Sequence, residues 1–143
     1  KFGSEKSALG LPVQAQYWSG STWVINDGDS CTTVPANAFA LSGGIAANTS
    51  AAALTLVAGN GTVTLAAPSP QAVGYVDVAA NLGSSGADQS CLTSHGGTAA
   101  NRPWLRAQNG ACAATYDRDP SARATFGMRS PESRKIIHVR EIF

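Results

Sequence analysis

The stretch that decides the fold class is AALTLVAGNGTVTLAAP, residues 52–68. Apolar and polar side chains alternate on both sides of the Gly-Asn-Gly triplet at residues 59–61. Alternation with a period of two is the pattern of a β-strand with one buried face, and a Gly-Asn-Gly triplet is typical of a tight turn. The stretch therefore predicts two short strands joined as a hairpin.

The same period of two extends outward along most of the chain. The only helix candidate, the alanine-rich run at residues 36–53, is interrupted by Ser-Gly-Gly and by Asn-Thr-Ser, so loop and short strand are predicted there. About seven strands separated by closely spaced turns favour an all-β antiparallel sandwich, immunoglobulin-like or related, formed as a single domain over residues 1–143. Further strands are predicted at residues 11–18, 22–26, 73–82, 122–128 and 135–143.

The composition favours an exported β-domain over a cytosolic enzyme. Only 13% of the 143 residues are charged, about half of the roughly 25% that is usual in globular domains. The formal net charge of +1 provides no basic field for nucleic acid or for an anionic membrane surface. No apolar run reaches the roughly 18 residues that a membrane helix needs. We expect a portion of a longer exported protein, with no nucleic-acid partner and no direct membrane insertion.

Three cysteines, Cys31, Cys91 and Cys112, are present, and none belongs to a C-x-x-C pair. In an exported protein this odd number favours one disulfide and one remaining thiol. Cys91 and Cys112 flank a Gly-rich polar segment with little to pack, which a disulfide would stabilise. We predict a Cys91–Cys112 disulfide, with Cys31 buried or paired elsewhere. A zinc site on Cys91, His95 and Cys112 is the less favoured alternative because its fourth ligand is unassigned.

Two aspartate pairs have the i, i+2 spacing of calcium-binding loops: Asp27 and Asp29 in NDGDS, and Asp117 and Asp119 in DRDPS. Neither pair is followed by the bidentate glutamate of such a loop. Turn formation is therefore the favoured role of these four residues, and calcium binding is the alternative. No cofactor is predicted.

No motif for nucleophilic catalysis is present. The chain has no G-x-S-x-G sequence to present a serine, and its two histidines are predicted to lie in a loop and on the last strand. Trp18, Trp23 and Trp104 would be the residues of a sugar-binding platform. Because Trp18 and Trp23 flank one predicted turn, core packing or stapling of the hairpin is the favoured role for both.

The stretch DRDPSARATFG, residues 117–127, combines two aspartates, two arginines and a proline directly before an alternating run. Pro120 fixes the backbone where the chain enters the strand. Asp117 and Asp119 can accept N–H groups at the strand end, and Arg118 and Arg123 can clamp these carboxylates. We predict a structural corner at this position.

The sequence KIIHVREIF, residues 135–143, is apolar on both faces. Such a strand is normally central in a sheet or covered on both sides, which is the favoured interpretation. At an edge it would instead offer a template for strand addition by a neighbouring subunit. The residues of this candidate edge are Ile136, Ile137, His138, Val139 and Arg140.

The stretches YDRDPSARATFG and SPESRKIIHVREIF resemble the C-terminus of MshQ-type proteins. These are large exported proteins associated with the mannose-sensitive haemagglutinin pilus, a type IV pilus of Gram-negative bacteria. Further upstream, FGSEKSALGLPVQAQYWSGSTWVINDGDSCT and TVTLAAPSPQAVGYVDVAANL are similar to the same family, so the resemblance extends over essentially the whole chain.

The resemblance implies a non-enzymatic extracellular module of a pilus-associated adhesin or assembly protein. Its expected partners are other pilus or surface-assembly subunits, including further copies in a filament. One alternative is a structural subunit or accessory domain of an extracellular filament, packed on a separate pilin-like stalk. A carbohydrate-binding or hydrolase domain is the remaining, less favoured alternative.

Overall fold

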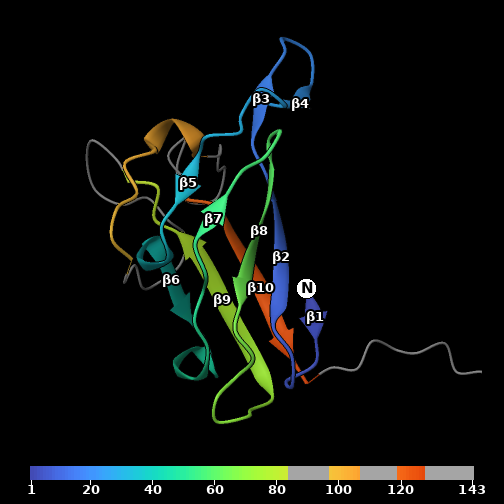
Figure 1. The fold of residues 1–143 in the computed structure, drawn as a ribbon, viewed down its shortest axis with the longest axis vertical. Coiled ribbons are helices and arrows are strands. Elements are labelled where there is room, and N and C mark those ends of the chain that lie inside the picture. The colour runs from blue at the N-terminus through green and yellow to red at the C-terminus, as the bar shows by residue number, and fades with distance from the viewer. Residues whose placement is uncertain (84–96, 107–118, 128–143) are drawn as a thin grey trace, which may run out of the picture.

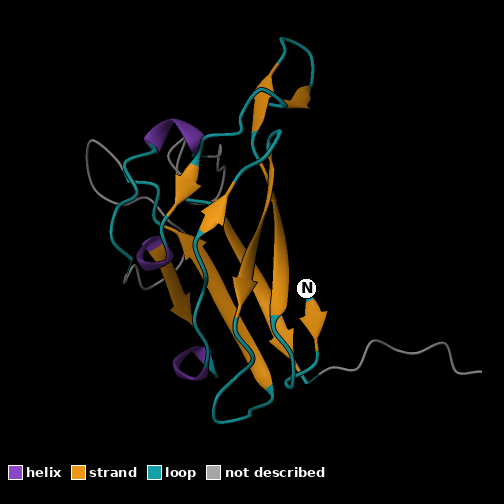
Figure 2. Cartoon of the chain, in the orientation of Figure 1, coloured by secondary structure: helices purple, strands orange, loops and turns teal. Residues whose placement is uncertain are grey.

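The computed structural model describes residues 1–83, 97–106 and 119–127. These residues form an all-β fold, as the sequence predicts, with ten strands and three short 3₁₀ helices (Figure 1, Figure 2). No helix among them is long and apolar enough to cross a membrane. The strands are β1 (Phe2–Gly3), β2 (Leu9–Gln14), β3 (Gln16–Trp18), β4 (Trp23–Ile25), β5 (Thr33–Val34), β6 (Phe39–Ser42), β7 (Leu54–Thr55), β8 (Asn60–Leu65), β9 (Gly74–Ala80) and β10 (Ser121–Phe126), and the helices are η1 (Ala36–Ala38), η2 (Ala46–Asn48) and η3 (Pro103–Leu105).

One layer is a four-stranded sheet in the order β1–β10–β9–β6. β9 pairs antiparallel with both β10 and β6. β1 runs parallel to β10, with Phe2 opposite Thr125 and Gly3 opposite Phe126. This parallel pair joins the two ends of the described chain and is not part of the antiparallel arrangement that the sequence predicts.

The second layer lies in front of this sheet in Figure 1 and contains β2, β8, β7 and β5. β2 pairs antiparallel with β8, and β5 pairs antiparallel with β7. A hydrogen bond from the Ala52 N–H to the Thr64 carbonyl oxygen (2.8 Å) connects the chain before β7 to β8. The two layers together form a β-sandwich.

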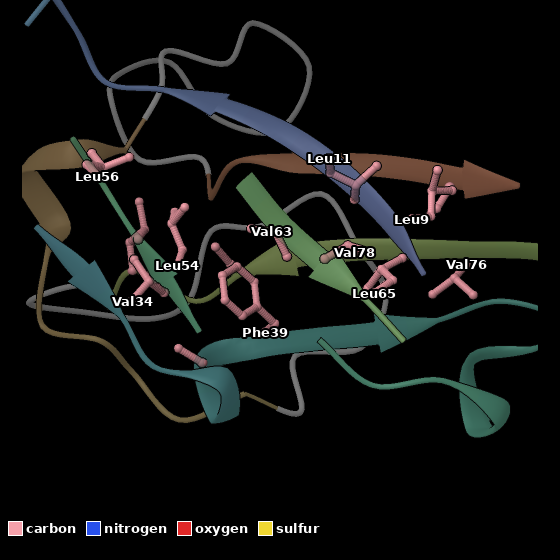
Figure 3. Packing of buried hydrophobic residues seen from close by; sticks show 14 of the residues in the cluster. Leu9, Leu11, Val34, Phe39, Leu54, Leu56, Val63, Leu65, Val76 and Val78 are labelled. Atoms are coloured by element: carbon pink, nitrogen blue, oxygen red, sulfur yellow. The ribbon is translucent and has the colours of Figure 1, made fainter. Parts of the chain in front are cut away.

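The hydrophobic core lies between the layers (Figure 3). In β2 and β8 alternate residues point inward, and their register places the inward residues side by side: Leu9 is opposite Leu65, and Leu11 is opposite Val63. Period-two alternation therefore becomes a continuous apolar face on each layer. Members of the core from both layers are Leu9, Leu11, Val34, Phe39, Leu54, Leu56, Val63, Leu65, Val76, Val78, Ala124 and Phe126.

The tight turn of the central hairpin lies one residue earlier than the Gly-Asn-Gly triplet suggests. Val57 and Asn60 form a bridge with two hydrogen bonds between them, so Ala58 and Gly59 are the turn residues. Both have positive φ, 48° and 71°, as a two-residue turn of type I′ requires. Asn60 and Gly61 already belong to β8.

Two features account for the difference between about seven predicted strands and the ten in the structure. The predicted strand at residues 11–18 is divided at Ala15 into β2 and β3. β1 and β5 contain two residues each, which is too short to show alternation in the sequence. β7 is the predicted strand before the turn, and the predicted strand at residues 135–143 lies outside the described residues. The predicted loop and short strand at residues 36–53 is confirmed, since β6 lies between η1 and η2.

Candidate functional site

The β3–β4 hairpin projects from one end of the sandwich and exposes large apolar side chains (Figure 1). On one face Trp18 and Trp23 are cross-strand partners, 52% and 45% exposed, with ring centroids 5.7 Å apart and an interplanar angle of 61°. On the other face Tyr17 is opposite Val24, and both are exposed. The predicted core role of Trp18 and Trp23 is therefore wrong, whereas an edge-to-face cross-strand pair is what a hairpin staple requires.

The base of the hairpin is fixed by backbone hydrogen bonds around Ala15. The Ala15 N–H donates to the Gly59 carbonyl oxygen (2.8 Å), and its own carbonyl oxygen accepts from the Asn26 N–H (2.9 Å). Ala15 is buried, although the residues that follow it are exposed. The hairpin is thus anchored at its base to the turn of the β7–β8 hairpin, while no third strand of residues 1–83, 97–106 and 119–127 pairs with β3 or β4.

A row of side-chain amides continues from the tryptophan pair along the outer face of β2 and β8. Gln16 donates from Nε2 to Gln14 Oε1 (3.3 Å), and Gln14 donates from Nε2 to Asn60 Oδ1 (3.1 Å). Since side chains two residues apart share a strand face, Trp18 lies on the same face as Gln16. We name Trp18, Trp23, Gln16, Gln14 and Asn60 the aromatic–amide strip.

The aromatic–amide strip is free of formal charge. Residues 7–26 and 60–65 contain no Asp, Glu, Lys or Arg, and no Lys or Arg occurs anywhere between residues 7 and 101. The polar groups of the strip are therefore neutral donors and acceptors. The strip itself therefore has no charged side chain to attract an ionic ligand.

Two hollows adjoin the strip. A surface depression of about 500 Å³ is lined by Pro12, Val13, Gln14, Asn60 and Gly61. A larger groove of about 920 Å³ opens between the layers and has all three tryptophans in its lining. Trp104 is 69% exposed on η3, where the Arg102 guanidinium lies 5.6 Å from its ring centroid.

Asp29, one of the calcium candidates, accepts hydrogen bonds from the turn to which it belongs. Its Oδ1 accepts the backbone N–H groups of Thr32 (3.0 Å) and Cys31 (3.3 Å). The side-chain hydrogen bond of Thr32, together with these backbone bonds, lowers the pKa of Asp29 below its ordinary value despite the opposing effect of burial. Asp27 is exposed in the same turn. In the described part of the chain, no group of three or more His, Cys, Asp or Glu side chains is placed to hold a metal ion.

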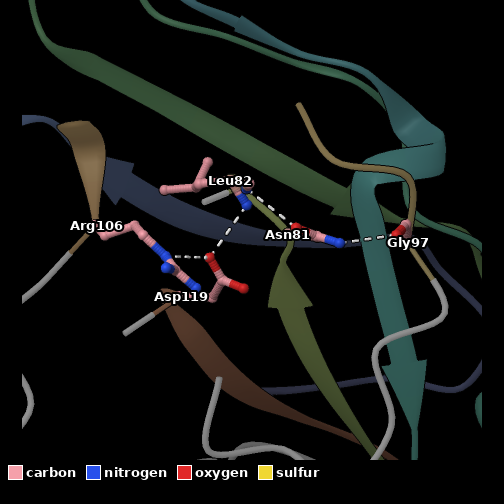
Figure 4. A network of polar contacts seen from close by, with 6 residues as sticks. Asn81, Leu82, Gly97, Arg106 and Asp119 are labelled. Atoms are coloured by element: carbon pink, nitrogen blue, oxygen red, sulfur yellow. Dashed lines mark hydrogen bonds and ion pairs between the residues drawn. The ribbon is translucent and has the colours of Figure 1, made fainter. Parts of the chain in front are cut away.

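Asp119, at the predicted corner, is fully buried directly before β10 (Figure 4). Its Oδ1 accepts hydrogen bonds from Arg106 Nε (3.1 Å) and from the backbone N–H of Leu82 (3.1 Å). The side chains of Arg106 and Asp119 are 3% and 0% exposed. Next to this contact, Asn81 donates from Nδ2 to the Gly97 carbonyl oxygen (2.9 Å). One carboxylate therefore ties the end of β9, the segment after η3 and the start of β10 together.

The predicted role of Arg123 as a clamp for the corner carboxylates is corrected by its position on β10. Arg123 lies opposite Asp77 on β9 and donates to both of its carboxylate oxygens, from Nε at 2.7 Å and from Nη2 at 2.8 Å. Its guanidinium also lies 4.3 Å from the ring centroid of Tyr75. The prediction paired Arg123 with aspartates nearby in the sequence. In the structure its partner is the residue opposite it on the neighbouring strand.

Several predicted residues lie outside the described residues. They are the Cys91–Cys112 disulfide, Asp117 and Arg118 of the corner, and the candidate strand-addition edge at Ile136, Ile137, His138, Val139 and Arg140. Cys31 is described, and it is an exposed free thiol whose Sγ lies 3.9 Å from Asp29 Oδ1. The expectation that Cys31 is buried or in another disulfide is therefore wrong.

Sequence reasoning missed Arg106 and the amide row. Arg106 pairs with a carboxylate 13 positions away, and no local spacing rule connects residues at that separation. Gln14 and Asn60 are 46 positions apart. The alternation of Gln14, Gln16 and Trp18 on the polar side of a predicted strand was the available signal, because it already placed these three side chains on one face.

Comparisons with known proteins identify a family. A family model described as DUF6701, fourth domain, matches residues 1–142. No curated protein and no solved structure matches the chain.

Proposed function

The chain belongs to the DUF6701 fourth-domain family, and on that premise we propose that it is a non-enzymatic attachment module of an exported surface protein. The module contacts its target through the β3–β4 hairpin. The resemblance to the C-terminus of MshQ-type proteins supports a place in a type IV pilus-associated adhesin or assembly protein on the surface of a Gram-negative bacterium. Other pilus or surface-assembly subunits are then its neighbours.

The observation that carries this proposal is the exposure of Tyr17, Trp18, Trp23 and Val24 together on one projecting hairpin, at 51%, 52%, 45% and 37%. Large aromatic side chains in water forgo the stabilisation that burial gives them, about 25 cal/mol for each Å² of apolar surface. Contiguous exposed apolar surface on a soluble domain marks contact sites. Trp and Tyr are also the residues that most often dominate binding energy.

The hairpin is suited to contact because its exposed side chains lie outside the hydrophobic core. Trp18 and Trp23 are not members of the core cluster, and backbone hydrogen bonds around Ala15 hold the base of the hairpin. Binding residues on an extension of a rigid scaffold can be substituted with little effect on the stability of the scaffold.

The proposal is tested in cells that produce the full-length protein. Trp18→Ser combined with Trp23→Ser is expected to reduce surface attachment roughly tenfold, the loss typical of truncated contact aromatics. The matched control is Trp104→Ser, which removes an exposed tryptophan from η3. Antibody labelling of intact cells measures the amount of displayed protein in each strain.

Attachment by the double variant at the level of the parent strain, with equal surface display, would overturn the proposal. Loss of surface display in the double variant alone, with its isolated domain still folded, would favour the alternative of a subunit packed on a pilin-like stalk.

A further inference from the structure

We infer that the aromatic–amide strip binds an uncharged polysaccharide. The inference rests on the proposed function, because it names the chemical class of target that the attachment hairpin contacts. It uses one face of the hairpin, that of Trp18 and Trp23, and continues onto the outer face of the sandwich through Gln16, Gln14 and Asn60.

The tryptophan pair supplies surfaces on which a sugar ring can stack. The negative face of an aromatic ring attracts groups that carry partial positive charge, and the C–H groups on one side of a pyranose ring are of that kind. An edge-to-face pair occupies a single face of one ring. About half of each side chain of Trp18 and Trp23 remains exposed for a ligand.

The amide row supplies hydrogen bonds in fixed directions. Each side-chain amide has two N–H donors and an oxygen with two lone pairs. The bonds from Gln16 to Gln14 and from Gln14 to Asn60 use one donor of each glutamine and one lone pair of each acceptor. Asn60 is held in turn by its bond to the Ala58 carbonyl oxygen (2.8 Å). One N–H of each glutamine remains for a ligand, and hydroxyl groups can both accept and donate at such sites.

The absence of charged side chains in the strip favours a neutral ligand. An anionic polysaccharide is normally held by Arg or Lys, and neither occurs between residues 7 and 101. A protein partner normally meets a polar rim that includes charged residues, whereas residues 7–26 and 60–65 contain none. Aromatic faces with neutral donors and acceptors therefore match an uncharged glycan best.

The dimensions of the strip suit a short stretch of a chain polymer. Gln14 and Trp18 are four residue steps apart, a separation of at most about 14 Å in an extended chain. The depression of about 500 Å³ beside Gln14 and Asn60 provides a hollow at the end opposite the tryptophans. This volume lies within the range of roughly 300–1,000 Å³ that is usual for ligand sites.

The test is native affinity electrophoresis of the 143-residue chain in gels that contain dextran, soluble starch, galactomannan or hydroxyethylcellulose. The chain is expected to be retarded by at least one of these neutral polymers and not by alginate, which is anionic. Trp18→Ala and Gln16→Ala are each expected to weaken the retardation constant roughly tenfold. Phe2→Ala is the matched control, because it removes a comparably exposed ring from β1, which belongs to the other sheet and not to the attachment hairpin.

The inference is overturned if none of the four polymers retards the chain, if alginate alone does so, or if Phe2→Ala weakens binding as much as Trp18→Ala. Should Trp18→Ala unfold the chain, Gln16→Ala decides, since it alters an exposed side chain. The cell-attachment test separates the two proposals. Loss of attachment in the double tryptophan variant without polysaccharide binding in vitro sinks this inference and leaves the proposed function standing.

Discussion

Asp119 and Asp77 each form an ion pair with an arginine, but one pair is buried and the arginine of the other is largely exposed to solvent. Asp119 is fully buried with Arg106, whereas Arg123, the partner of Asp77, has a side chain that is 61% exposed. Removing one partner of a buried pair leaves the other charge desolvated, but an exposed charge is compensated by water. The two pairs therefore make very different contributions to stability although their contact distances are similar.

We expect Asp119→Ala to lower the free energy of unfolding by about 3–5 kcal/mol, because the Arg106 guanidinium then stays buried without this carboxylate. Arg123→Ala is expected to lower it by at most about 1 kcal/mol. Urea denaturation followed by far-UV circular dichroism measures both values. Equal losses in the two variants would contradict the structural role assigned to Asp119.

The lowered pKa of Asp29 makes the stability of the fold dependent on pH. Its pKa is lower in the folded chain than in the unfolded chain, so ionised Asp29 stabilises the fold above its ordinary pKa of about 3.9. This contribution disappears as the pH falls through the folded-state pKa. Asp29→Asn is expected to melt at a lower temperature than the parent chain near neutral pH, and the difference is expected to shrink between about pH 6 and about pH 2. A melting-temperature difference that stays constant across this range would contradict the assignment.

Among the structural elements, the β7–β8 hairpin shows what a turn signal can and cannot specify. Gly-Asn-Gly correctly indicates a hairpin, but the turn residues are Ala58 and Gly59. The inward side chains decide this position: Leu54 and Leu56 before the turn and Val63 and Leu65 after it are all buried. A shift of the register by one residue would move one of these sets to the surface.

Substitutions at Ala58 and Gly59 are expected to change the free energy of unfolding in opposite directions. Ala58 has a φ of 48°, a left-handed conformation that costs a residue with a Cβ about 1–2 kcal/mol. We expect Ala58→Gly to raise the free energy of unfolding by about 1 kcal/mol. Gly59→Ala is expected to lower it by about 1–3 kcal/mol, since a Cβ there meets the Asn26 carbonyl group. Thermal denaturation of both variants checks the signs, and a stabilising Gly59→Ala would disprove the turn assignment.

The sequence predicted the two strands of the β3–β4 hairpin but not that its tryptophans are exposed. Period-two alternation and the Ser-Gly-Ser turn indicate two paired strands. Alternation cannot reveal whether another layer covers a given face, because that depends on residues distant in the sequence. Trp18 and Trp23 therefore had the pattern of core residues, although the hairpin extends beyond the second layer.

For the molecule as a whole, the fold class followed from local alternation, whereas the closure of the sandwich did not. The predicted strands at residues 73–82 and 122–128 correspond to β9 and β10. The pairing of β1 with β10 joins residues more than 120 positions apart, and β1 contributes only two residues to it. The contact between Arg106 and Asp119 likewise depends on where the layers bring the chain together. Both are products of tertiary packing, which no local period encodes.

The parallel pairing of β1 with β10 has a mechanical consequence. Tension applied along the chain through Phe2 and Gly127 pulls the two strands in opposite directions along their common axis. Two hydrogen bonds carry this load: Thr125 N–H to the Lys1 carbonyl oxygen (2.8 Å) and Gly127 N–H to the Gly3 carbonyl oxygen (3.0 Å). Because the force acts along the strands, both bonds are loaded in shear at the same time and do not break one after another. Forced rupture is governed by the rate of unfolding, and a ladder that must break at once slows that rate. We expect a domain closed in this way to resist tension along its length better than its equilibrium stability alone indicates.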